Sequence, residues 1–291
     1  MKRYVGSRAS RLAVLQTQLV MDALQHADSA LELELVTMTT TGDRILDKTL
    51  EQIGGKGLFV RELDRALLAG EVDLTVHSLK DLPMELQPSL PIAAYYQRED
   101  PRDVLVLRKG LEALPERPVI GTASRRRALF VEELFPGAEV RPIRGNVQTR
   151  LSRLDSGDYD AIILSSAGLK RCGLLERISR FFAPEELIPA AGQGILAIQC
   201  REGDTFPAME LIDDFTSRTC ALAERAFVAA LDGGCTAPTC AYASLEGDTL
   251  HLLGLYLTPT GERRRGAFSG AAVDAEAIGR ELAGSLRGAQ R

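Results

Sequence analysis

The sequence predicts an α/β fold followed by a small α+β domain. Up to about residue 212, short apolar runs alternate with segments of helical periodicity, which is typical of an α/β chain. After Phe215 the pattern changes to one helix, three strand-like runs and a closing helix. The chain has 291 residues, 45% of them hydrophobic, which is enough for two or three cores. We therefore expect several domains, with mostly parallel strands in the α/β part.

Each expected element follows from its local pattern. Apolar runs bounded by Gly, Pro or polar residues predict strands at 3–6, 32–39, 73–78, 92–96, 104–107, 119–121, 140–144, 161–164 and 196–200. Helical periodicity predicts helices at 11–27, 58–68, 124–134 and 147–156. The first helix places these residues broadly on one face: Leu12, Leu15, Leu19, Met21, Leu24 and Ala27. In the C-terminal part we expect helices at 220–231 and 275–286, and strands at 241–245, 250–257 and 264–268.

Two pairs of segments indicate a weak internal repeat. VGSRASR at 5–11 resembles IGTASRR at 120–126, and GEVD at 70–73 resembles GDYD at 157–160. Charged residues with a proline at 98–103, and clustered Pro and Gly at 189–194, predict two linker segments between the halves. The chain would leave the first half, build the second and return. The expected domains are 1–97 with 193–213, then 98–192, then 214–291.

Composition excludes several function classes. The formal net charge is -5, so the field of the whole molecule repels nucleic acid and anionic membranes. No apolar run approaches the ~20 residues that span a bilayer, and MKRYVGSRAS lacks the apolar core of a signal peptide. We expect a cytoplasmic protein with no membrane or nucleic-acid partner. Five cysteines without C-x-x-C, and three scattered histidines, give little support for a metal site or a disulfide framework.

Hydroxyl groups and arginines gather where strands are expected to end. In both repeat segments a strand ends in Gly, then Ser or Thr, then Arg, where a helix begins, which can form an anion site. The alternative is a Ser N-cap with solvated arginines. Residues 121–180 hold 11 Lys and Arg against seven acids, and arginine suits bidentate binding of carboxylates or phosphates. We expect a small substrate with several carboxylates; the alternative is a solvated basic face.

Two further segments supply candidate residues. GGKGLF at 54–59 lacks the spacing of a Walker A loop, so it predicts a lid or hinge with Lys56 as an anion contact. DLTVHSLKD at 73–81 predicts a buried strand. Near its carboxyl end, where open α/β sheets bind ligands, it would deliver four residues: His77, Ser78, Lys80 and Asp81. A carboxylate among arginines needs a cationic or hydrogen-bond-donating partner. The alternative for Asp81 is an ordinary surface pair with Lys80.

Cys235 follows two glycines at the end of an expected helix, which can present its thiol on an exposed loop. Cysteines are more often buried as small hydrophobic residues. A protease nucleophile would need an activating histidine, and none lies nearby in the sequence. The thiol can also be an attachment point for another group.

Together these segments resemble the porphobilinogen deaminase family, whose members are also called hydroxymethylbilane synthases. The resemblance rests on motifs along nearly the whole chain: SRAS, TTTGDRILD, GGKGLF, VHSLKDLP, REDPRD, GTASRRR, IRGNVQTRL, DAIILSSAGLKR, AAGQG, AERAF and GGC. It implies two periplasmic-binding-protein-like α/β domains with a catalytic cleft between them, a small C-terminal α+β domain, and a monomer.

The resemblance also implies the chemistry. A dipyrromethane cofactor, made from the enzyme's own substrate, would be joined to Cys235 by a thioether. Four porphobilinogen molecules would be deaminated and joined head to tail onto it, and hydrolysis would release linear hydroxymethylbilane. Loss of ammonia from the substrate leaves a positive charge that Asp81, the aspartate of H-S-x-K-D, would stabilise. The product would pass transiently to uroporphyrinogen-III synthase.

Residue roles carry over position by position. Lys80 and Asp81 would be catalytic. The cofactor would be held by Lys80, Asp81, Ser124, Arg126, Arg127, Arg144, Arg150 and Gly168. The substrate would be held by Arg8, Ser10, Lys56, Arg144, Arg150 and Arg171. Tyr4 and Gln52 stand where some relatives have a basic residue, so one carboxylate would have a different partner here.

A second hypothesis belongs to another class. Two periplasmic-binding-like halves could form a sensor or carrier of an organic anion, without catalysis. That hypothesis explains the arginines, but it gives no reason for Cys235, Asp81 or the third domain.

Overall fold

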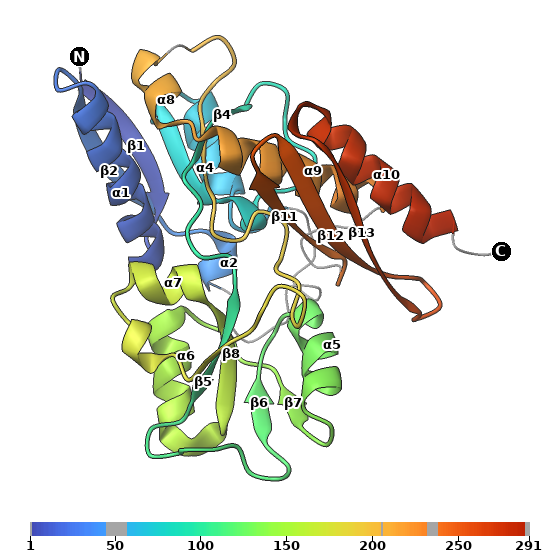
Figure 1. The fold of residues 1–291 in the computed structure, drawn as a ribbon. Coiled ribbons are helices and arrows are strands. Elements are labelled where there is room, and N and C mark those ends of the chain that lie inside the picture. Colours follow the sequence, from blue (N-terminus) through green and yellow to red (C-terminus); the bar gives the residue numbers. More distant parts are fainter. Residues whose placement is uncertain (1, 45–56, 205, 232–237, 289–291) are drawn as a thin grey trace. The chain divides into compact units, whose positions relative to one another are not determined.

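The computed structural model describes residues 2–44, 57–204, 206–231 and 238–288 (Figure 1). The chain forms two compact units, Met1–Glu99 with Ile195–Thr219, and Asp100–Gly194 with Cys220–Arg291. It passes from one unit to the other at 99–100 and 194–195, in or beside the two expected linker segments, and again at 219–220. The second expected domain and the C-terminal one lie in the same unit, so the division into three domains stays a prediction.

The first unit is built on a mixed five-stranded sheet with the order β2-β1-β3-β10-β4. β1 is parallel to β2 and β3, whereas β10 is antiparallel to β3 and β4. The strands are β1 (Lys2–Arg8), β2 (Glu32–Met38), β3 (Leu74–Ser78), β4 (Ile92–Tyr96) and β10 (Leu196–Gln199). The helices are α1 (Arg11–Ala27), α2 (Thr41–Arg44), α4 (Arg61–Leu68) and α8 (Pro207–Ile212).

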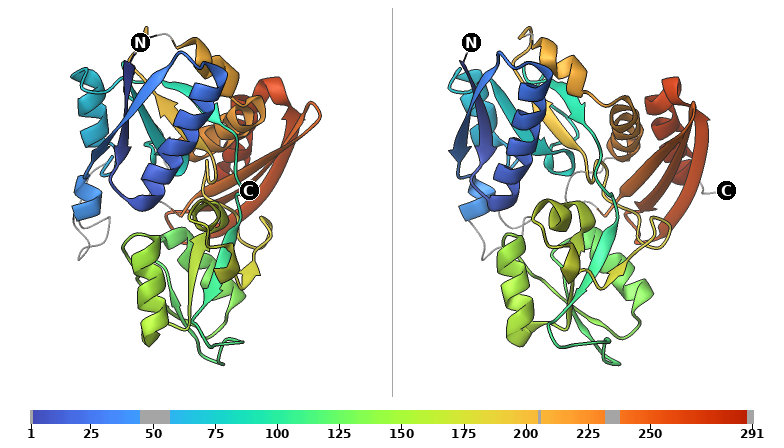
Figure 2. Two further views of the ribbon diagram at one scale, coloured as in Figure 1. Left: turned by 90° about the vertical axis from the view of Figure 1, so that its left-hand side faces the viewer. Right: turned by 60° about the vertical axis from the view of Figure 1, so that its left-hand side comes forward.

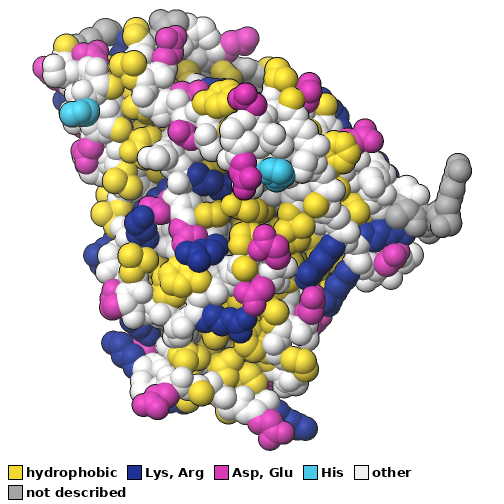
Figure 3. All heavy atoms as spheres, in the orientation of Figure 1, with side chains coloured by type: hydrophobic (Ala, Val, Ile, Leu, Met, Phe, Trp, Pro, Cys, Tyr) yellow, Lys and Arg dark blue, Asp and Glu magenta, His cyan; other side chains and the backbone are white. Residues whose placement is uncertain are grey.

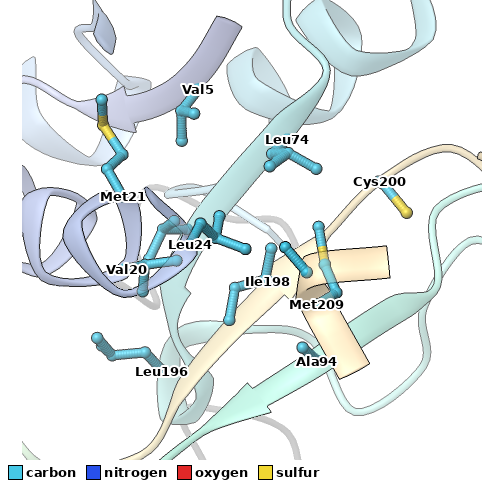
Figure 4. Packing of buried hydrophobic residues seen from close by; sticks show 12 residues of the cluster. Val5, Val20, Met21, Leu24, Leu74, Ala94, Leu196, Ile198, Cys200 and Met209 are labelled. Atoms are coloured by element: carbon cyan, nitrogen blue, oxygen red, sulfur yellow. The ribbon is translucent and has the colours of Figure 1, made fainter. Parts of the chain in front are cut away.

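Helix α1 packs on this sheet through one apolar side. Val20 and Leu24 are buried in a cluster with Leu74 of β3 and Ile198 of β10 (Figure 4). The expected apolar face is wrong at Leu19, whose side chain is 42% exposed. The buried side of α1 continues instead through two polar residues, described next.

Gln16 and Thr17 occupy buried positions of α1 at which apolar residues would be expected. They are buried there because each forms a hydrogen bond with a strand of the sheet. Thr17 Oγ1 donates to Ser7 Oγ at 2.8 Å, and Gln16 Oε1 accepts from Ser78 Oγ at 3.2 Å. Ser7 and Ser78 lie at the carboxyl ends of β1 and β3. A polar patch therefore lies between the start of α1 and this edge of the sheet.

The second unit contains a sheet of the same kind, with the order β7-β6-β8-β5-β9. β6 is parallel to β7 and β8, whereas β5 is antiparallel to β8 and β9. The strands are β5 (Asp103–Leu107), β6 (Val119–Gly121), β7 (Glu139–Arg141), β8 (Ala161–Ser165) and β9 (Arg180–Phe181). The helices are α5 (Arg125–Leu134), α6 (Val147–Arg153) and α7 (Ser166–Arg171).

The C-terminal part forms a three-stranded antiparallel sheet with helices on one face (Figure 2). Its elements are α9 (Phe215–Ala230), β11 (Cys240–Glu246), β12 (Thr249–Leu257), β13 (Arg263–Ala271) and α10 (Ala275–Gly288). Cys240 and Leu255 share a buried cluster with Phe130 of α5 and Ile163 of β8. The predicted fold class, two α/β sheets and a small α+β part, is confirmed.

The internal repeat extends to individual hydrogen bonds. Asp73 precedes β3; its side chain accepts from Tyr4 N–H at 2.8 Å and its own N–H donates to Tyr4 O at 2.8 Å. Asp160 precedes β8 and makes the same two bonds with Val119 of β6, both at 2.9 Å. The GEVD and GDYD segments therefore perform the same task in both sheets, which is to join the start of one strand to its parallel neighbour.

The expectation of mostly parallel strands is confirmed, because four of the five described strands in each sheet run in the same direction. The remaining strand, β10 or β5, runs against them, which gives each sheet two antiparallel neighbour pairs. The antiparallel pairs all involve β10 or β5. Each is the first strand that the chain forms after passing into its unit. An apolar run indicates a buried strand, but its direction depends on where the chain enters the sheet.

A close helix contact in the C-terminal part gives a stability prediction. A Cβ atom at Gly279 of α10 would lie 2.4 Å from Ala223 O and 2.8 Å from Phe227 N of α9. Gly279→Ala must push the two helices apart, so we expect it to lower the free energy of unfolding by about 1–3 kcal/mol. In Gly284→Ala, on the same helix, the new Cβ meets no described atom within 4 Å. That control should gain up to about 1 kcal/mol from helix propensity. Urea denaturation measures the free energy of unfolding of both variants. Equal values for Gly279→Ala and Gly284→Ala would contradict the close contact between α9 and α10.

Candidate functional site

In the first unit, the predicted residues lie at the carboxyl ends of two parallel neighbours, β1 and β3. Arg8 is the last residue of β1, and Ser10 is the N-cap of α1. Lys80 and Asp81 belong to the short 3-10 helix η1 (Leu79–Asp81), directly after β3. This is the edge at which open α/β sheets bind ligands. The structure therefore brings these four residues to one edge of one sheet.

Arg8 is held by an aspartate. Its guanidinium donates to both carboxylate oxygens of Asp43, with 3.1 Å between Nε and Oδ2, and lies 4.3 Å from the ring centroid of Phe59. Burial raises the pKa of the Asp43 carboxyl, but hydrogen bonds from Arg8 and Thr40 outweigh burial and lower this pKa below its ordinary value. The pair is therefore charged at neutral pH and fixes the direction of Arg8.

Ser10 and His77 both have internal roles. Ser10 Oγ accepts the N–H of Ala13 at 3.4 Å, which is the capping interaction of α1. His77 is buried in β3, with Nε2 2.9 Å from Thr75 Oγ1. Burial, together with the charge of Arg8, lowers the pKa of His77 to about 3. The ring is therefore neutral near pH 7 and does not supply protons there.

The backbone positions Lys80 and Asp81. Leu79, between β3 and these residues, is fully buried, and its N–H donates to Ile195 O at 3.0 Å. Leu82 N–H closes the short helix by donating to Leu79 O at 3.1 Å. With both flanking leucines buried, the side chains of Lys80 and Asp81 are left half-buried at the edge.

Arg126 and Arg127 of the second unit are buried beside a buried aspartate. Asp103, the first residue of β5, is fully buried and lies 2.6 Å from Arg126 Nη1 and 2.7 Å from Arg127 Nη2. Arg126 also donates to Ile188 O, and Arg127 donates to Ile163 O. These arginines thus have partners inside the protein. Their role as ligands of carboxylates stays a prediction.

In the second unit, Ser124 is the N-cap of α5, Arg144 precedes α6 and Arg150 lies within α6. Ser124 Oγ caps α5 by accepting Arg127 N–H at 3.4 Å. Arg150 Nε donates to Gly145 O at 2.8 Å. Gly145 has φ 112°, and a Cβ there would lie 2.8 Å from the Thr149 side chain, so the turn requires glycine. Arg144 and Arg150, on either side of this turn, are both half-buried.

Gly168 and Arg171 belong to α7, which directly follows β8. Gly168 is buried, and Arg171 Nη2 donates to Gly194 O at 2.6 Å. Arg171 therefore contacts the segment 189–194, by which the chain returns to the first unit.

Sequence reasoning missed three buried polar residues that support this edge. Asp103 pairs with the two arginines, and Gln193 Nε2 donates to Asp103 Oδ1 at 3.0 Å and to Pro101 O at 2.7 Å. Glu224 of α9 is fully buried and accepts Gly192 N–H at 2.6 Å and Ala243 N–H at 2.8 Å. The motifs REDPRD and AAGQG were interpreted as linker segments and as part of the family resemblance, and AERAF only as part of the resemblance. No local pattern identifies these two roles, because Asp103 ends the charged run 98–103 and Glu224 is followed directly by Arg225.

Three residues singled out in the sequence, Lys56, Cys235 and Gln52, lie outside the described residues. Tyr4 is described, and its backbone N–H donates to Asp73 as stated above. Basic and acidic side chains are interspersed on the face shown in Figure 3. Among the described residues, no group of three or more His, Cys, Asp or Glu could hold a metal ion. None of the described helices is both long and apolar enough to cross a membrane.

Comparison with known proteins identifies two family models. The model described as "Porphobilinogen deaminase, dipyromethane cofactor binding domain" matches residues 4–208. The model described as "Porphobilinogen deaminase, C-terminal domain" matches residues 218–288. Together they cover nearly the whole chain.

Curated relatives agree with these models. The chain is 50% identical over 283 residues to the porphobilinogen deaminase of Acetivibrio thermocellus, covering 97% of each protein. It is 49% identical over 288 residues to that of Ruminiclostridium cellulolyticum, covering 99% of this chain and 98% of the relative. It is 47% identical over 290 residues to that of Chromobacterium violaceum, covering 98% and 94%.

Solved structures with a similar fold have low sequence identity. They include the periplasmic VFT2 domain of Bordetella pertussis BvgS, 16% identical, covering 72% of this chain and 85% of that one, with a TM-score of 0.43. They also include the periplasmic aliphatic sulphonate binding protein SsuA from Escherichia coli, 11% identical, covering 79% and 70%, with a TM-score of 0.43.

The Asp103 cluster gives a second prediction. Asp103→Asn leaves two buried guanidinium groups without their carboxylate, so we expect a loss of about 3–5 kcal/mol in the free energy of unfolding. Asp155→Asn is the matched control, because Asp155 pairs with Arg177 at 2.8 Å but is partly exposed. That control should lose less than about 1 kcal/mol. Similar losses in both variants, measured by denaturant titration, would mean that the buried cluster is not important for stability.

Proposed function

Because the chain belongs to the porphobilinogen deaminase family, we propose that Cys235 and Asp81 are the residues on which its chemistry depends. The activity is hydroxymethylbilane synthesis from porphobilinogen, a step of tetrapyrrole biosynthesis, and the cofactor is dipyrromethane. The activity and the cofactor follow from the two family models, which match residues 4–208 and 218–288. The family match does not support the alternative hypothesis of a non-catalytic sensor or carrier of an organic anion.

The residues present fit the dipyrromethane group. Its pyrrole rings carry acetate and propionate, so it needs several cationic donors. In the second unit, Arg150 and Arg171 are each anchored on a backbone carbonyl through one guanidinium nitrogen. A guanidinium has five N–H donors, so an anchored arginine is pre-oriented for bidentate binding of a carboxylate. The donor set thus matches the chemistry of the group.

We infer that the cofactor is joined to Cys235 by a thioether. The residues that would hold it are Lys80, Asp81, Ser124, Arg126, Arg127, Arg144, Arg150 and Gly168. When bound, the dipyrromethane supplies the terminal pyrrole ring to which substrate units are added. Arg126 and Arg127 would bind a carboxylate with donors that Asp103 does not use.

Asp81 is proposed to stabilise the positive charge that develops on the substrate. When ammonia leaves the aminomethyl group of porphobilinogen, positive charge spreads onto the pyrrole nitrogen. A carboxylate held half-buried by the flanking leucines is close to fixed, and a preorganised charge stabilises such a transition state more than a mobile one. The substrate carboxylates would be held by Arg8, Ser10, Lys56, Arg144, Arg150 and Arg171. Lys80 is proposed to be catalytic together with Asp81.

Three further points complete the proposal. We class the enzyme as a transferase, because substrate units are transferred to a growing chain. We place it in the cytoplasm, where tetrapyrrole precursors are made. The product, a reactive linear tetrapyrrole, is proposed to pass transiently to uroporphyrinogen-III synthase.

Cofactor attachment gives a third prediction. The purified parent protein should exceed its sequence mass by two linked pyrrole units. Cys235→Ser should lack this added mass and all activity, whereas Ser at Cys172, Cys200, Cys220 or Cys240 should leave the adduct in place. These four thiols are buried, and burial raises the pKa of the Cys240 thiol to about 12, which makes it unreactive. Intact-mass spectrometry decides; an adduct that persists in Cys235→Ser overturns the assignment.

The charge of Asp81 gives a fourth prediction. Asp81→Asn keeps the size and one acceptor but removes the negative charge, so loaded enzyme should fold normally and lose roughly 10²–10³ in turnover. Asp81→Glu keeps the charge and should retain more activity than Asn. Turnover is compared only on molecules whose mass shows the adduct, since the same chemistry builds the cofactor. If loaded Asp81→Asn turns over within about threefold of the parent, the carboxylate is structural.

A further inference from the structure

A cavity of about 210 Å³ lies inside the first unit, between the start of α4 and the segment that follows η1. Its apolar wall includes Val60, Leu82 and Leu90, each at most 3% exposed. Its polar lining includes Asp64 of α4 and Gln199 of β10. Of these residues, only Leu82, which follows Asp81, is also part of the description of the proposed site.

Gln199 brings a buried hydrogen-bond acceptor to this cavity. The residue is 2% exposed, and its Nε2 donates to Leu90 O at 2.7 Å, which fixes the orientation of the amide. Its Oε1 is buried and accepts no hydrogen bond from the described residues. A buried carbonyl without a donor costs free energy, so a donor at this position would be stabilising.

Asp64 adds a half-buried carboxylate to the lining of the same cavity. Among the described residues, no hydrogen bond or ion pair joins the Asp64 side chain to a donor. Burial raises the pKa of this carboxyl to about 6, with no opposing interaction. Asp43 of α2 behaves differently, because it is paired with Arg8.

Charge and shape define the ligand. The charged groups that line the cavity are Arg61 and Asp64 of α4 and Glu85 of the facing segment, a balance of -1 when all are ionised. Two acceptors without donors, inside an apolar wall, suit a molecule with several N–H donors at one end and a short hydrocarbon part. We propose that this cavity binds a small primary ammonium compound, with its N–H groups directed to Asp64 and Gln199 Oε1.

The proposal sets the pH dependence of binding. An ammonium ligand requires ionised Asp64. The pKa of the Asp64 carboxyl in the folded protein is about 6. Binding of the ammonium ligand should therefore be complete above about pH 7 and should weaken as the pH falls through 6. In the ligand-free protein, the contribution of Asp64 to the free energy of unfolding has the opposite pH dependence from ligand binding. The raised pKa penalises the folded state when Asp64 is ionised, so this penalty is present above pH 6 and is relieved as the pH falls from 6 towards 4.

The experiment uses the full-length, cofactor-loaded protein and propylammonium chloride as the probe. Tetramethylammonium chloride, which has no N–H donor, and sodium chloride at equal ionic strength are the reference salts. At tenfold above its Kd, propylammonium should raise the Tm at pH 7.5 by about 2–4 °C, and the reference salts should not. The shift should be much smaller at pH 5. Isothermal titration calorimetry supplies the Kd.

Variants separate this site from a general salt effect. Asp64→Asn should bind propylammonium at least tenfold more weakly, and without ligand its Tm at pH 7.5 should exceed that of the parent. Gln199→Met removes the second acceptor and should also weaken binding. Asp22→Asn, at an exposed position on α1, is the control and should bind as the parent does. Equal shifts with propylammonium and tetramethylammonium overturn the proposal. The proposal is also overturned if both site variants bind propylammonium with the affinity of the parent. It is overturned as well if the parent does not bind propylammonium at all, in which case the cavity holds only water.

Discussion

One buried carboxylate, that of Asp103, holds the charged interior of the second unit together. Burying two guanidinium groups costs several kcal/mol each, and only a close counter-ion with further hydrogen bonds offsets that cost. Asp103 pairs with both Arg126 and Arg127, and Gln193 adds a third donor. Since Asp103 is the first residue of β5, this one contact relates the entering strand, the first turn of α5 and the returning segment 189–194. Arg171 contacts the same returning segment through Gly194 O.

The two sheets share one plan but differ in the charge of their ligand-binding edges. Matching hydrogen bonds from Asp73 and Asp160 show that the plan is repeated in detail. The edge of the first unit then carries Asp81 beside the neutralised pair of Arg8 and Asp43, whereas the edge of the second carries arginines. The repeat therefore supplies two edges that have diverged in electrostatics.

Much of the fold could be predicted from the sequence, for reasons that particular elements make clear. Helix α1 begins at Arg11 and ends at Ala27 as expected, because Ser10 caps it and its period is sustained over several turns. Short elements such as β9 and α7 were not predicted, since two to six residues show too little periodicity. Strand direction and the polar contacts of Gln16 and Thr17 depend on tertiary partners that no local pattern contains. At the site, Arg8 and Asp81 could be predicted from strand ends, but Asp103 and Glu224 could not, because their roles arise only from distant residues.

We propose that the protein builds a tetrapyrrole on a covalently held dipyrromethane and does not merely bind porphobilinogen. The most direct test follows ammonia release and intact mass together, on wild-type protein incubated with porphobilinogen. We expect one ammonia for each porphobilinogen consumed and accumulation of linear tetrapyrrole. The protein should keep the mass of two pyrrole units after the substrate is exhausted. Saturable binding of porphobilinogen without ammonia release, on a protein whose mass equals that of the bare chain, would contradict this proposal.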